Sequence, residues 1–345
     1  MTIIIFILIL GAIIFVHELG HFLFAKANGV YVYEFALGMG PKLISKKTKE
    51  TTYSLRLIPI GGFCQLAGED TEMDKDHKVP KNRTLQAKNP WQRFLIMFFG
   101  AGFNFIFAIL VLFFISLFGG SADYRPIIST VEKNMPAVEA GIKKGDIIKE
   151  IDGHKIKTID DISLYLVIAP HNKATKIVVN RDGKNITYKV QAKKVKEKGE
   201  KVYRYGIGLD SKKKHGLINA IKYTYHKTGA IFRQMAVTLK SLFTGGVKLN
   251  QLSGPVGIYS IVGEQSKDGL ASILYLMAFL SINVGFINLL PLPAFDGGHI
   301  LFIIIEMIKG SPVKPETENM IHTIGLFLLM ALMVYITFND IMKLF

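Results

Sequence analysis

Four long apolar runs constrain this chain more than any other feature. The first fills residues 3–16 and resumes after a short polar cluster, and the others extend over residues 94–118, 270–293 and 321–338. A bilayer core of about 30 Å requires about 20 apolar residues per helix, because no water is present there to bind free backbone groups. The runs therefore predict a polytopic α-helical membrane protein with four transmembrane helices.

The composition agrees with a membrane protein and excludes several other classes. The 345 residues are 50% hydrophobic and only 20% charged, with a mean hydropathy of +0.31, which excludes intrinsic disorder. Cys64 is the single cysteine, so an intramolecular disulfide framework is excluded as well. The net charge of +15 fits contact with the anionic headgroups of a lipid bilayer, and we expect no nucleic acid partner.

The distribution of basic residues predicts the orientation in the membrane. The first apolar run has no basic segment before it and no small-residue cleavage site, so we expect a retained helix and not a signal peptide. Residues 25–93 carry 12 Lys and Arg residues, which predicts a cytoplasmic location for this loop by the positive-inside rule. Both termini and the long segment 119–269 then lie on the outer side of the membrane.

The segment after the second apolar run has the composition of a soluble domain. Val, Ile and Tyr alternate between turns such as Asp152-Gly153, which predicts a small α+β fold. Residues 134–160 resemble the bacterial PDZ signature, in which Pro-Ala precedes Ala-Gly-Ile, Gly-Asp and an Asp-Gly turn. PDZ folds bind extended peptides at a sheet edge, so the resemblance implies peptide recognition or size filtering. A spacer domain without a ligand is the alternative.

The chain is predicted to have four parts. They are a first membrane half (1–118), an extracytoplasmic PDZ domain (119–210), a membrane-surface helix with a connecting segment (211–269), and a second membrane half (270–345). Apolar and basic residues mix at helical spacing in residues 215–243, which suits a helix on the membrane surface. A helix packed on the soluble domain fits the same residues equally well.

The candidate chemistry lies at the end of the first apolar run, where His-Glu-Leu-Gly-His begins at His17. At about 100° per residue, His17 and His21 lie on one face of a helix one turn apart, so both imidazoles can bind one metal ion. Glu18 projects beside them and is free to take a proton from water, as in zinc peptidases. Ionisable groups in a membrane helix are costly to bury unpaired, which favours a functional Zn2+ site.

A catalytic zinc site needs a third protein ligand and one open position. Asp296 is the leading candidate, because it follows the third apolar run on a stretch broken by prolines. Irregular backbone at membrane depth is tolerated only in a protein-lined or wet site. The first and third helices both run inward, which brings Asp296 to the depth of the two histidines. His299 and Glu34 are rival ligands with weaker context.

Three motifs occur in a characteristic order: HExxH, the PDZ signature and NLLPLPAFDGG. Together they resemble the site-2 protease family of intramembrane zinc metalloproteases, in its bacterial RseP/RasP-type branch with a single PDZ domain. The resemblance covers nearly the whole chain and implies three Zn2+ ligands, His17, His21 and Asp296. It also implies that Glu18 is the catalytic base and that Asn288 positions the substrate or assists the oxyanion.

Residues 31–70 resemble the membrane-associated β-hairpin region of that family. In the family the edge of this region presents backbone to an unwound substrate. We therefore expect the substrate segment to pair near Gly61 and Gly62, because a free strand edge offers the hydrogen bonds that an unwound helix has lost.

Residues 98–105 resemble the second-helix motif of the family, with Gly100 and Asn104 four positions apart. Helix packing through small residues explains this pair at least as well as a direct role.

Two features depart from the family pattern. Phe295 replaces the Leu usual before the ligand Asp, which puts the shape of the ligand loop in doubt. The single PDZ domain puts in doubt any regulation through paired domains.

The resemblance implies that the substrates are single-spanning transmembrane proteins, either anti-sigma factors or signal-peptide remnants. It places a multi-pass enzyme in the bacterial inner (cytoplasmic) membrane. Two other classes stay open: a PDZ-containing membrane receptor or scaffold with a non-catalytic metal site, and a metal or proton transporter. A scaffold would not need Glu18, and a transporter would be favoured by inverted repeats, which we do not find in the sequence.

Overall fold

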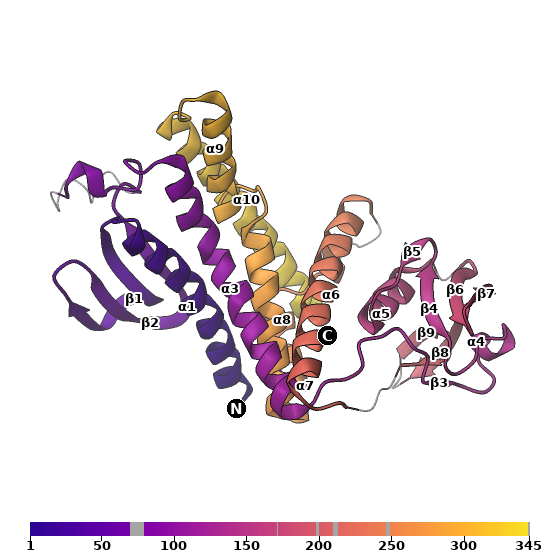
Figure 1. Ribbon diagram of the computed structural model, residues 1–345. Helices are drawn as coiled ribbons and strands as arrows, with labels where there is room; N and C mark the ends of the chain where they lie inside the picture. Colours follow the sequence, from indigo (N-terminus) through magenta and orange to yellow (C-terminus); the bar gives the residue numbers. More distant parts are fainter. Residues whose placement is uncertain (70–78, 171, 198–199, 210–212, 246–248, 344–345) are drawn as a thin grey trace. The chain divides into compact units, whose positions relative to one another are not determined.

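The computed structural model describes residues 1–69, 79–170, 172–197, 200–209, 213–245 and 249–343 (Figure 1). It divides into a first unit, Met1–Leu112 with Lys248–Phe345, and a second unit, Phe113–Val247. Asp70, at the end of the expected hairpin region, and the predicted boundary between residues 210 and 211 lie outside the described residues.

Among the described residues, four helices are long and apolar enough to cross a membrane. They are α1 (Thr2–Ala27), α3 (Pro90–Gly119), α8 (Leu270–Asn288) and Glu316–Met342 of α10 (Pro315–Met342). Each of the four predicted apolar runs thus corresponds to a helix long enough to cross a membrane, as expected for a membrane protein. The first unit also contains β1 (Val32–Lys47), β2 (Thr52–Leu66), α7 (Pro255–Gln265), α9 (Asp296–Lys309) and the short 3-10 helices η1 (Lys81–Arg83), η2 (Leu249–Gln251) and η3 (Ser266–Asp268).

The β1–β2 hairpin forms four strand segments, because both long strands bend. Residues 32–37 pair on one side with residues 62–66 and on the other side with residues 52–55, which also pair with residues 44–47. The segment order is therefore 62–66, 32–37, 52–55, 44–47, and residues 62–66 form one edge. This confirms the expected β region after the first apolar helix.

Two apolar clusters hold the first unit together. One joins α1 to α7 and α8 through Ile9, Ile13, Val262 and Leu276. The other joins the hairpin to α3 and α9, and its members include Val32, Leu66, Ile96, Ile300 and Ile303. An ion pair between Arg93 of α3 and Glu306 of α9 links the same two helices. The start of α9 is therefore fixed relative to α1, α3 and the hairpin, because large buried side chains allow little movement.

The second unit is a mixed α+β fold. Its main sheet is antiparallel in the order β5-β4-β6-β7, with the pairs β10-β3 and β8-β9 beside it. The elements are β3 (Thr130–Val131), α4 (Pro136–Glu139), β4 (Ile147–Ile151), β5 (His154–Lys155), α5 (Ile159–Ile168), β6 (Thr175–Arg181), β7 (Lys184–Val190), β8 (Lys193–Glu197), β9 (Glu200–Arg204), β10 (Ile207–Gly208) and α6 (Leu217–Phe243). Its core is built from buried side chains such as Ile148, Ile162 and Ile177.

Helix α6 is attached to α5 by two ion pairs. Arg233 Nε donates to Asp161 Oδ1 at 2.9 Å, and Lys227 Nζ donates to Asp160 Oδ1 at 2.6 Å. These contacts are those expected of a helix packed on the soluble domain, one of the two interpretations of this segment.

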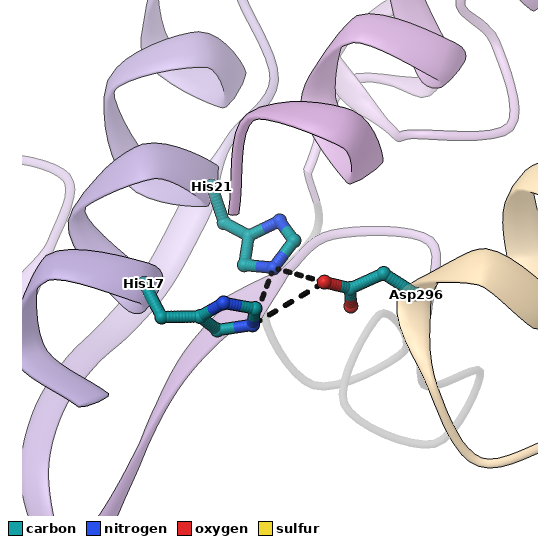
Figure 2. A group of neighbouring side chains, drawn as sticks. All are labelled: His17, His21 and Asp296. Carbon is teal, nitrogen blue, oxygen red and sulfur yellow. Dashed lines mark hydrogen bonds and ion pairs between the residues drawn. The ribbon is translucent and has the colours of Figure 1, made fainter. Parts of the chain in front are cut away.

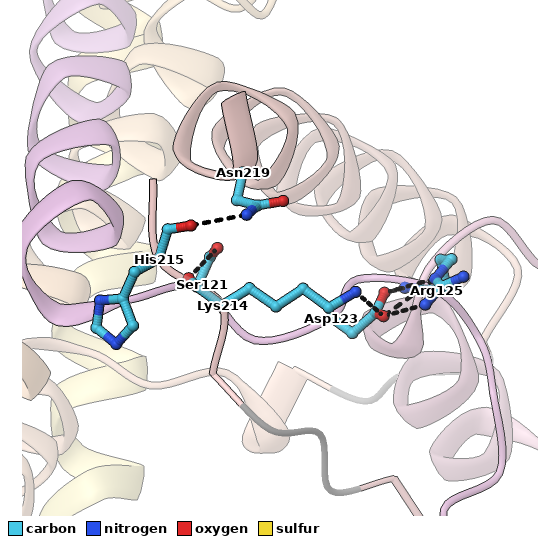
Figure 3. A network of polar contacts seen from close by, with 6 residues as sticks. All are labelled: Ser121, Asp123, Arg125, Lys214, His215 and Asn219. Atoms are coloured by element: carbon cyan, nitrogen blue, oxygen red, sulfur yellow. Dashed lines mark hydrogen bonds and ion pairs between the residues drawn. The ribbon is translucent and has the colours of Figure 1, made fainter. Parts of the chain in front are cut away.

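Within the second unit, the segment that follows α3 and the segment that precedes α6 are joined by a polar network (Figure 3). Ser121 and Lys214 exchange two backbone hydrogen bonds of 2.8 Å, and Lys214 Nζ lies 3.1 Å from Asp123 Oδ2. Arg125 also donates to Asp123, and these hydrogen bonds hold the pKa of Asp123 below its usual value.

Candidate metal centre

Three ligand-type atoms from distant parts of the sequence converge in the first unit (Figure 2). His17 and His21 project from α1, and Asp296 is the first residue of α9. The two Nε2 atoms are 3.3 Å apart, and each lies 3.3 Å from Asp296 Oδ2. The fold therefore brings the predicted third ligand to the HExxH histidines.

The spacing and chemistry of these atoms fit a zinc ion. Ligands bound tetrahedrally at about 2.0–2.1 Å lie about 3.3 Å from one another, which is the separation found here. Asp296 Oδ2 is buried and has no hydrogen-bond donor among the described residues. Burying a carboxylate oxygen without a hydrogen-bond donor costs free energy unless a cation binds to it. Two imidazoles and one carboxylate are also a donor set that zinc accepts.

The tautomer of His21 is set by the backbone of α3. Nδ1 of His21 lies 2.9 Å from the carbonyl oxygen of Ile96, which can only accept a hydrogen bond. Nδ1 therefore carries the hydrogen and donates it, so the neutral ring presents its Nε2 lone pair to the centre. This is the arrangement that orients metal-binding histidines in many proteins.

His17 has a side-chain partner on α3. Its Nδ1 lies 3.3 Å from the amide of Asn104, which is fully buried. The amide atom placed there is Nδ2, which can only donate. Turning the amide by 180° would bring Oδ1 to this position, and His17 would then donate from Nδ1 and present its Nε2 lone pair to the centre. Ser281 of α8 supports Asn104, because its Oγ donates to the backbone carbonyl oxygen of Asn104 at 2.9 Å. The sequence pointed to Asn104 only through the Gly100–Asn104 spacing and left its role undecided.

Close approach of α1 and α3 depends on two glycines. A Cβ added to Gly20 would lie 2.0 Å from the carbonyl oxygen of Phe99, and one added to Gly100 would lie 2.1 Å from His21 Nε2. Neither position can accept a side chain without moving a helix or a ligand. Gly100 thus serves helix packing and also leaves room for the His21 ring.

The edge segment of the hairpin lies beside Glu18. The backbone N–H of Cys64 lies close to the Glu18 carboxylate. A Cβ added to Gly62 would lie 3.4 Å from Glu18 Cγ, so β2 and α1 are in contact here. Gly61 has a φ of +92°, which disfavours other residues, and a Cβ there would lie 2.8 Å from Met39.

The other predicted site residues are placed differently. Asn288 is the last residue of α8, is half-buried and makes no side-chain hydrogen bond among the described residues. His299, a rival ligand, directs Nδ1 at Glu318 Oε1 at 3.1 Å. Phe295 is extended, with φ −115° and ψ 162°, and its ring does not keep the next carboxylate from the histidines.

Glu34, the second rival, has its own partners in the hairpin. Its carboxylate accepts hydrogen bonds from Ser54 at 2.5 Å and Arg56 at 2.8 Å, and Lys42 lies 2.9 Å away. Burial alone would raise the pKa of Glu34, but these donors hold it below the usual value. The carboxylate is therefore already neutralised by residues of the hairpin.

Comparison with known proteins gives matches over nearly the whole chain. Residues 5–332 match Peptidase family M50. The regulator of sigma-W protease RasP of Bacillus subtilis is 34% identical over 420 aligned residues, which cover 100% of this chain and 99% of the relative. The zinc metalloprotease RasP of Bacillus licheniformis is 34% identical over 419 residues with the same coverage. A protein of Clostridium perfringens, named as a candidate zinc metalloprotease, is 39% identical over 342 residues, 99% of this chain and 98% of the relative.

Proposed function

The chain belongs to peptidase family M50, and we propose that its Zn2+ is bound by His17, His21 and Asp296, with Glu18 as the general base. The protein is a multi-pass intramembrane zinc metalloprotease of the kind that acts in regulated intramembrane proteolysis. The observation that carries the ligand assignment is the set of three mutual distances of 3.3 Å among Nε2, Nε2 and Oδ2. The scaffold alternative does not account for Glu18 beside these atoms.

The chemistry divides between the metal and the chain. Zinc held by this group supplies Lewis-acid polarisation of the scissile carbonyl and lowers the pKa of water at the site. Glu18 takes the proton of the attacking water and delivers it to the amine nitrogen as the C–N bond breaks. The nearby backbone N–H of Cys64 helps to orient the Glu18 carboxylate for both transfers. Asn288, on the stretch that leads to Asp296, assists the developing oxyanion or holds the substrate strand.

The hairpin edge is the proposed binding site for the cleaved segment. A transmembrane helix has satisfied its own backbone hydrogen bonds, so its scissile carbonyl is reachable only after local unwinding. Residues 62–66 have one neighbour in the described pairing and lie beside Glu18, so their outer edge can pair with an unwound strand. Gly62 has no side chain to separate β2 from Glu18, and Gly61 next to it provides the left-handed backbone conformation that this edge requires.

The proposed substrates are single-spanning membrane proteins. The name of the Bacillus subtilis relative, a regulator of sigma-W protease, supports anti-sigma factors as one class. Remnants of signal peptides are a second class, because they are also single apolar helices left in the bilayer. In both cases cleavage falls within or near the transmembrane segment.

We further propose that residues 119–210 form a PDZ domain outside the bacterial inner membrane. The Pro-Ala to Asp-Gly signature falls on α4, β4 and the β4–β5 turn, and the antiparallel sheet with α5 is compatible with such a domain. The outer location follows from the 12 Lys and Arg residues of residues 25–93, which favour a cytoplasmic position for that loop.

The assignment of the base is tested by Glu18→Gln. The amide keeps the size of the side chain but cannot take a proton, so we expect cleavage of a model transmembrane substrate to fall about 10²–10⁴-fold. Zinc content, measured on the same detergent-purified protein, should stay at the wild-type level. Normal cleavage by this variant would exclude Glu18 as the base, and loss of zinc would give it a ligand role instead.

A further inference from the structure

His322 is the one ionisable residue in the apolar part of α10, and the mechanism above does not use it. Its Nδ1 lies 3.1 Å from the backbone nitrogen of Ala294. A backbone N–H can only donate, so Nδ1 accepts and the hydrogen of the neutral ring is on Nε2. Nε2 is buried without a hydrogen-bond partner among the described residues. The ring therefore accepts the hydrogen bond of the Ala294 N–H, while its own Nε2–H has no acceptor. Leaving a buried donor unpaired costs free energy, and the hydrogen bond to Ala294 must offset that cost.

Ala294 has an unusual backbone conformation. Its φ is +72°, in the left-handed region that residues with a Cβ rarely adopt. Such a conformation persists only where the surroundings hold it. Ala294 lies two residues before Asp296, so its conformation sets the direction in which the chain delivers the ligand carboxylate to the histidines.

A second contact from α10 holds the same loop. A Cβ added to Gly325 would lie 2.1 Å from Pro293 Cβ and 3.0 Å from the Pro293 carbonyl carbon. The loop therefore packs directly on the backbone of α10, one helical turn from His322. Two adjacent loop residues, Pro293 and Ala294, are thus held by two positions of one helix.

A stacking contact also fixes the orientation of the His322 ring. The ring of His299 stacks on it, with centroids 3.9 Å apart and an interplanar angle of 12°, and His299 Nδ1 donates to Glu318. These three side chains lie close enough to resemble a second metal site. Coordination through His322 Nε2 would require the hydrogen on Nδ1, where it would meet the N–H of Ala294. The geometry therefore favours a hydrogen-bonding role.

We propose that α10 positions the zinc ligand Asp296 through the loop before it. His322 is a positioning residue that accepts the Ala294 N–H, and Gly325 provides the surface on which Pro293 rests. This inference depends on the proposed function, because it takes Asp296 as a ligand. It assigns to the last transmembrane helix, which contributes no ligand, a part in setting the affinity of the site for zinc.

The test compares His322→Asn with His322→Leu in the full-length protein. Asn places an oxygen acceptor where Nδ1 was, and Leu has nearly the same shape without an acceptor. We expect Leu to weaken zinc binding about 10- to 100-fold, as loss of a supporting partner does at other metal sites, and Asn to retain most of the wild-type affinity. The measurement is chelator competition on detergent-purified protein below its unfolding temperature. Thr323→Val, an exposed neighbour on α10, is the matched control and should bind zinc like wild type.

Gly325→Ala provides an independent arm, because the added methyl group must displace Pro293, and it should also weaken zinc binding. Equal affinities of the Asn and Leu variants would overturn the positioning role. Two zinc ions per wild-type chain, with one lost in His322→Asn, would replace it with a second metal site. Unchanged zinc binding in Asp296→Ala would overturn the ligand assignment itself, and the role of His322 with it.

Discussion

Asp161 in the second unit and Asp296 in the first are both carboxylates in the first turn of a helix, yet their surroundings differ. Asp161 accepts hydrogen bonds from the backbone nitrogens of Lys157 and Thr158, at 2.9 and 2.8 Å, and from Arg233. Among the residues that the structure describes, Asp296 Oδ2 faces two imidazole nitrogens at 3.3 Å and has no other polar partner.

The comparison separates a carboxylate with a structural role, Asp161, from the proposed zinc ligand, Asp296. The chain supplies a cation and backbone donors to Asp161, so this group is complete without any other molecule. Around Asp296 the chain supplies two imidazoles and no Lys or Arg side chain among the described residues, and one imidazole, that of His21, has its hydrogen directed away toward Ile96. Converging lone pairs are stable only around a proton or a metal ion. The unsatisfied cluster is therefore the one that points to function.

The largest difference is expected between the two alanine variants of these carboxylates. Asp296→Ala should abolish detectable cleavage and weaken zinc binding by more than about 100-fold, beyond the usual effect of losing only a supporting partner. Asp161→Ala should leave the zinc content of the purified protein unchanged. Zinc content by elemental analysis checks both, and zinc loss in Asp161→Ala would break the comparison.

A smaller effect is expected from the partner of His17. Asn104→Leu removes the amide that faces His17 Nδ1 and keeps the volume, so zinc affinity should fall about 10- to 100-fold. Asn283→Leu on α8 is the control, because the Asn283 amide donates to the Phe279 carbonyl of its own helix and has no other hydrogen-bond partner in the described part of the chain. Equal affinities of the two variants would show that Asn104 serves packing alone.

Changes around the Asp161 carboxylate should alter the stability of the second unit and leave zinc binding unchanged. Arg233→Met leaves Asp161 buried without its cation and should destabilise the second unit by about 1–3 kcal/mol, a figure reduced because Arg233 is about a third exposed. Hydrogen exchange of residues 113–245 in the full-length protein measures this change. Arg233→Lys, which keeps the charge but not the two-pronged geometry, should have a smaller effect. Zinc content should stay constant in both variants.

Lowering the pH should gradually destabilise the second unit. Burial alone would raise the pKa values of Asp161 and Asp146, but hydrogen bonds from Arg233 and Arg181 hold both below the usual value. A lowered folded-state pKa stabilises above the unfolded pKa of about 4, and this contribution is lost as pH falls toward the folded value. Protection of residues 113–245 should be constant from about pH 7 to 5 and decline below about 4. Asp161→Asn should flatten that decline; an unchanged profile would contradict the role of the pair.

Local patterns in the sequence were enough to predict much of this protein. Long, nearly uncharged apolar runs can satisfy their backbone groups in a bilayer only as helices, so the four candidate spans followed from composition and length. The His17–His21 pair followed from helical periodicity, since residues four apart share a face. Asp296 followed from its position after a proline-broken stretch.

Contacts between segments that are distant in sequence were decided by the tertiary structure. The sequence did not show that Asn104 and Ile96 would orient the histidines, or that Cys64 N–H would meet Glu18. It also left His299 and Glu34 as rivals, which the fold pairs with Glu318 and with hairpin residues.

The physical reason for this division is the range over which each interaction acts. Periodicity, helix breaking and transfer into a bilayer depend on neighbours within a few turns, so the sequence alone determined the spans, the metal-binding motif and the general chemistry. Tautomers, partners and the direction of a carboxylate depend on atoms placed by packing between helices. Which nitrogen of His21 faces the centre, and what holds the loop before Asp296, were therefore decided only when α1, α3, α9 and α10 came together.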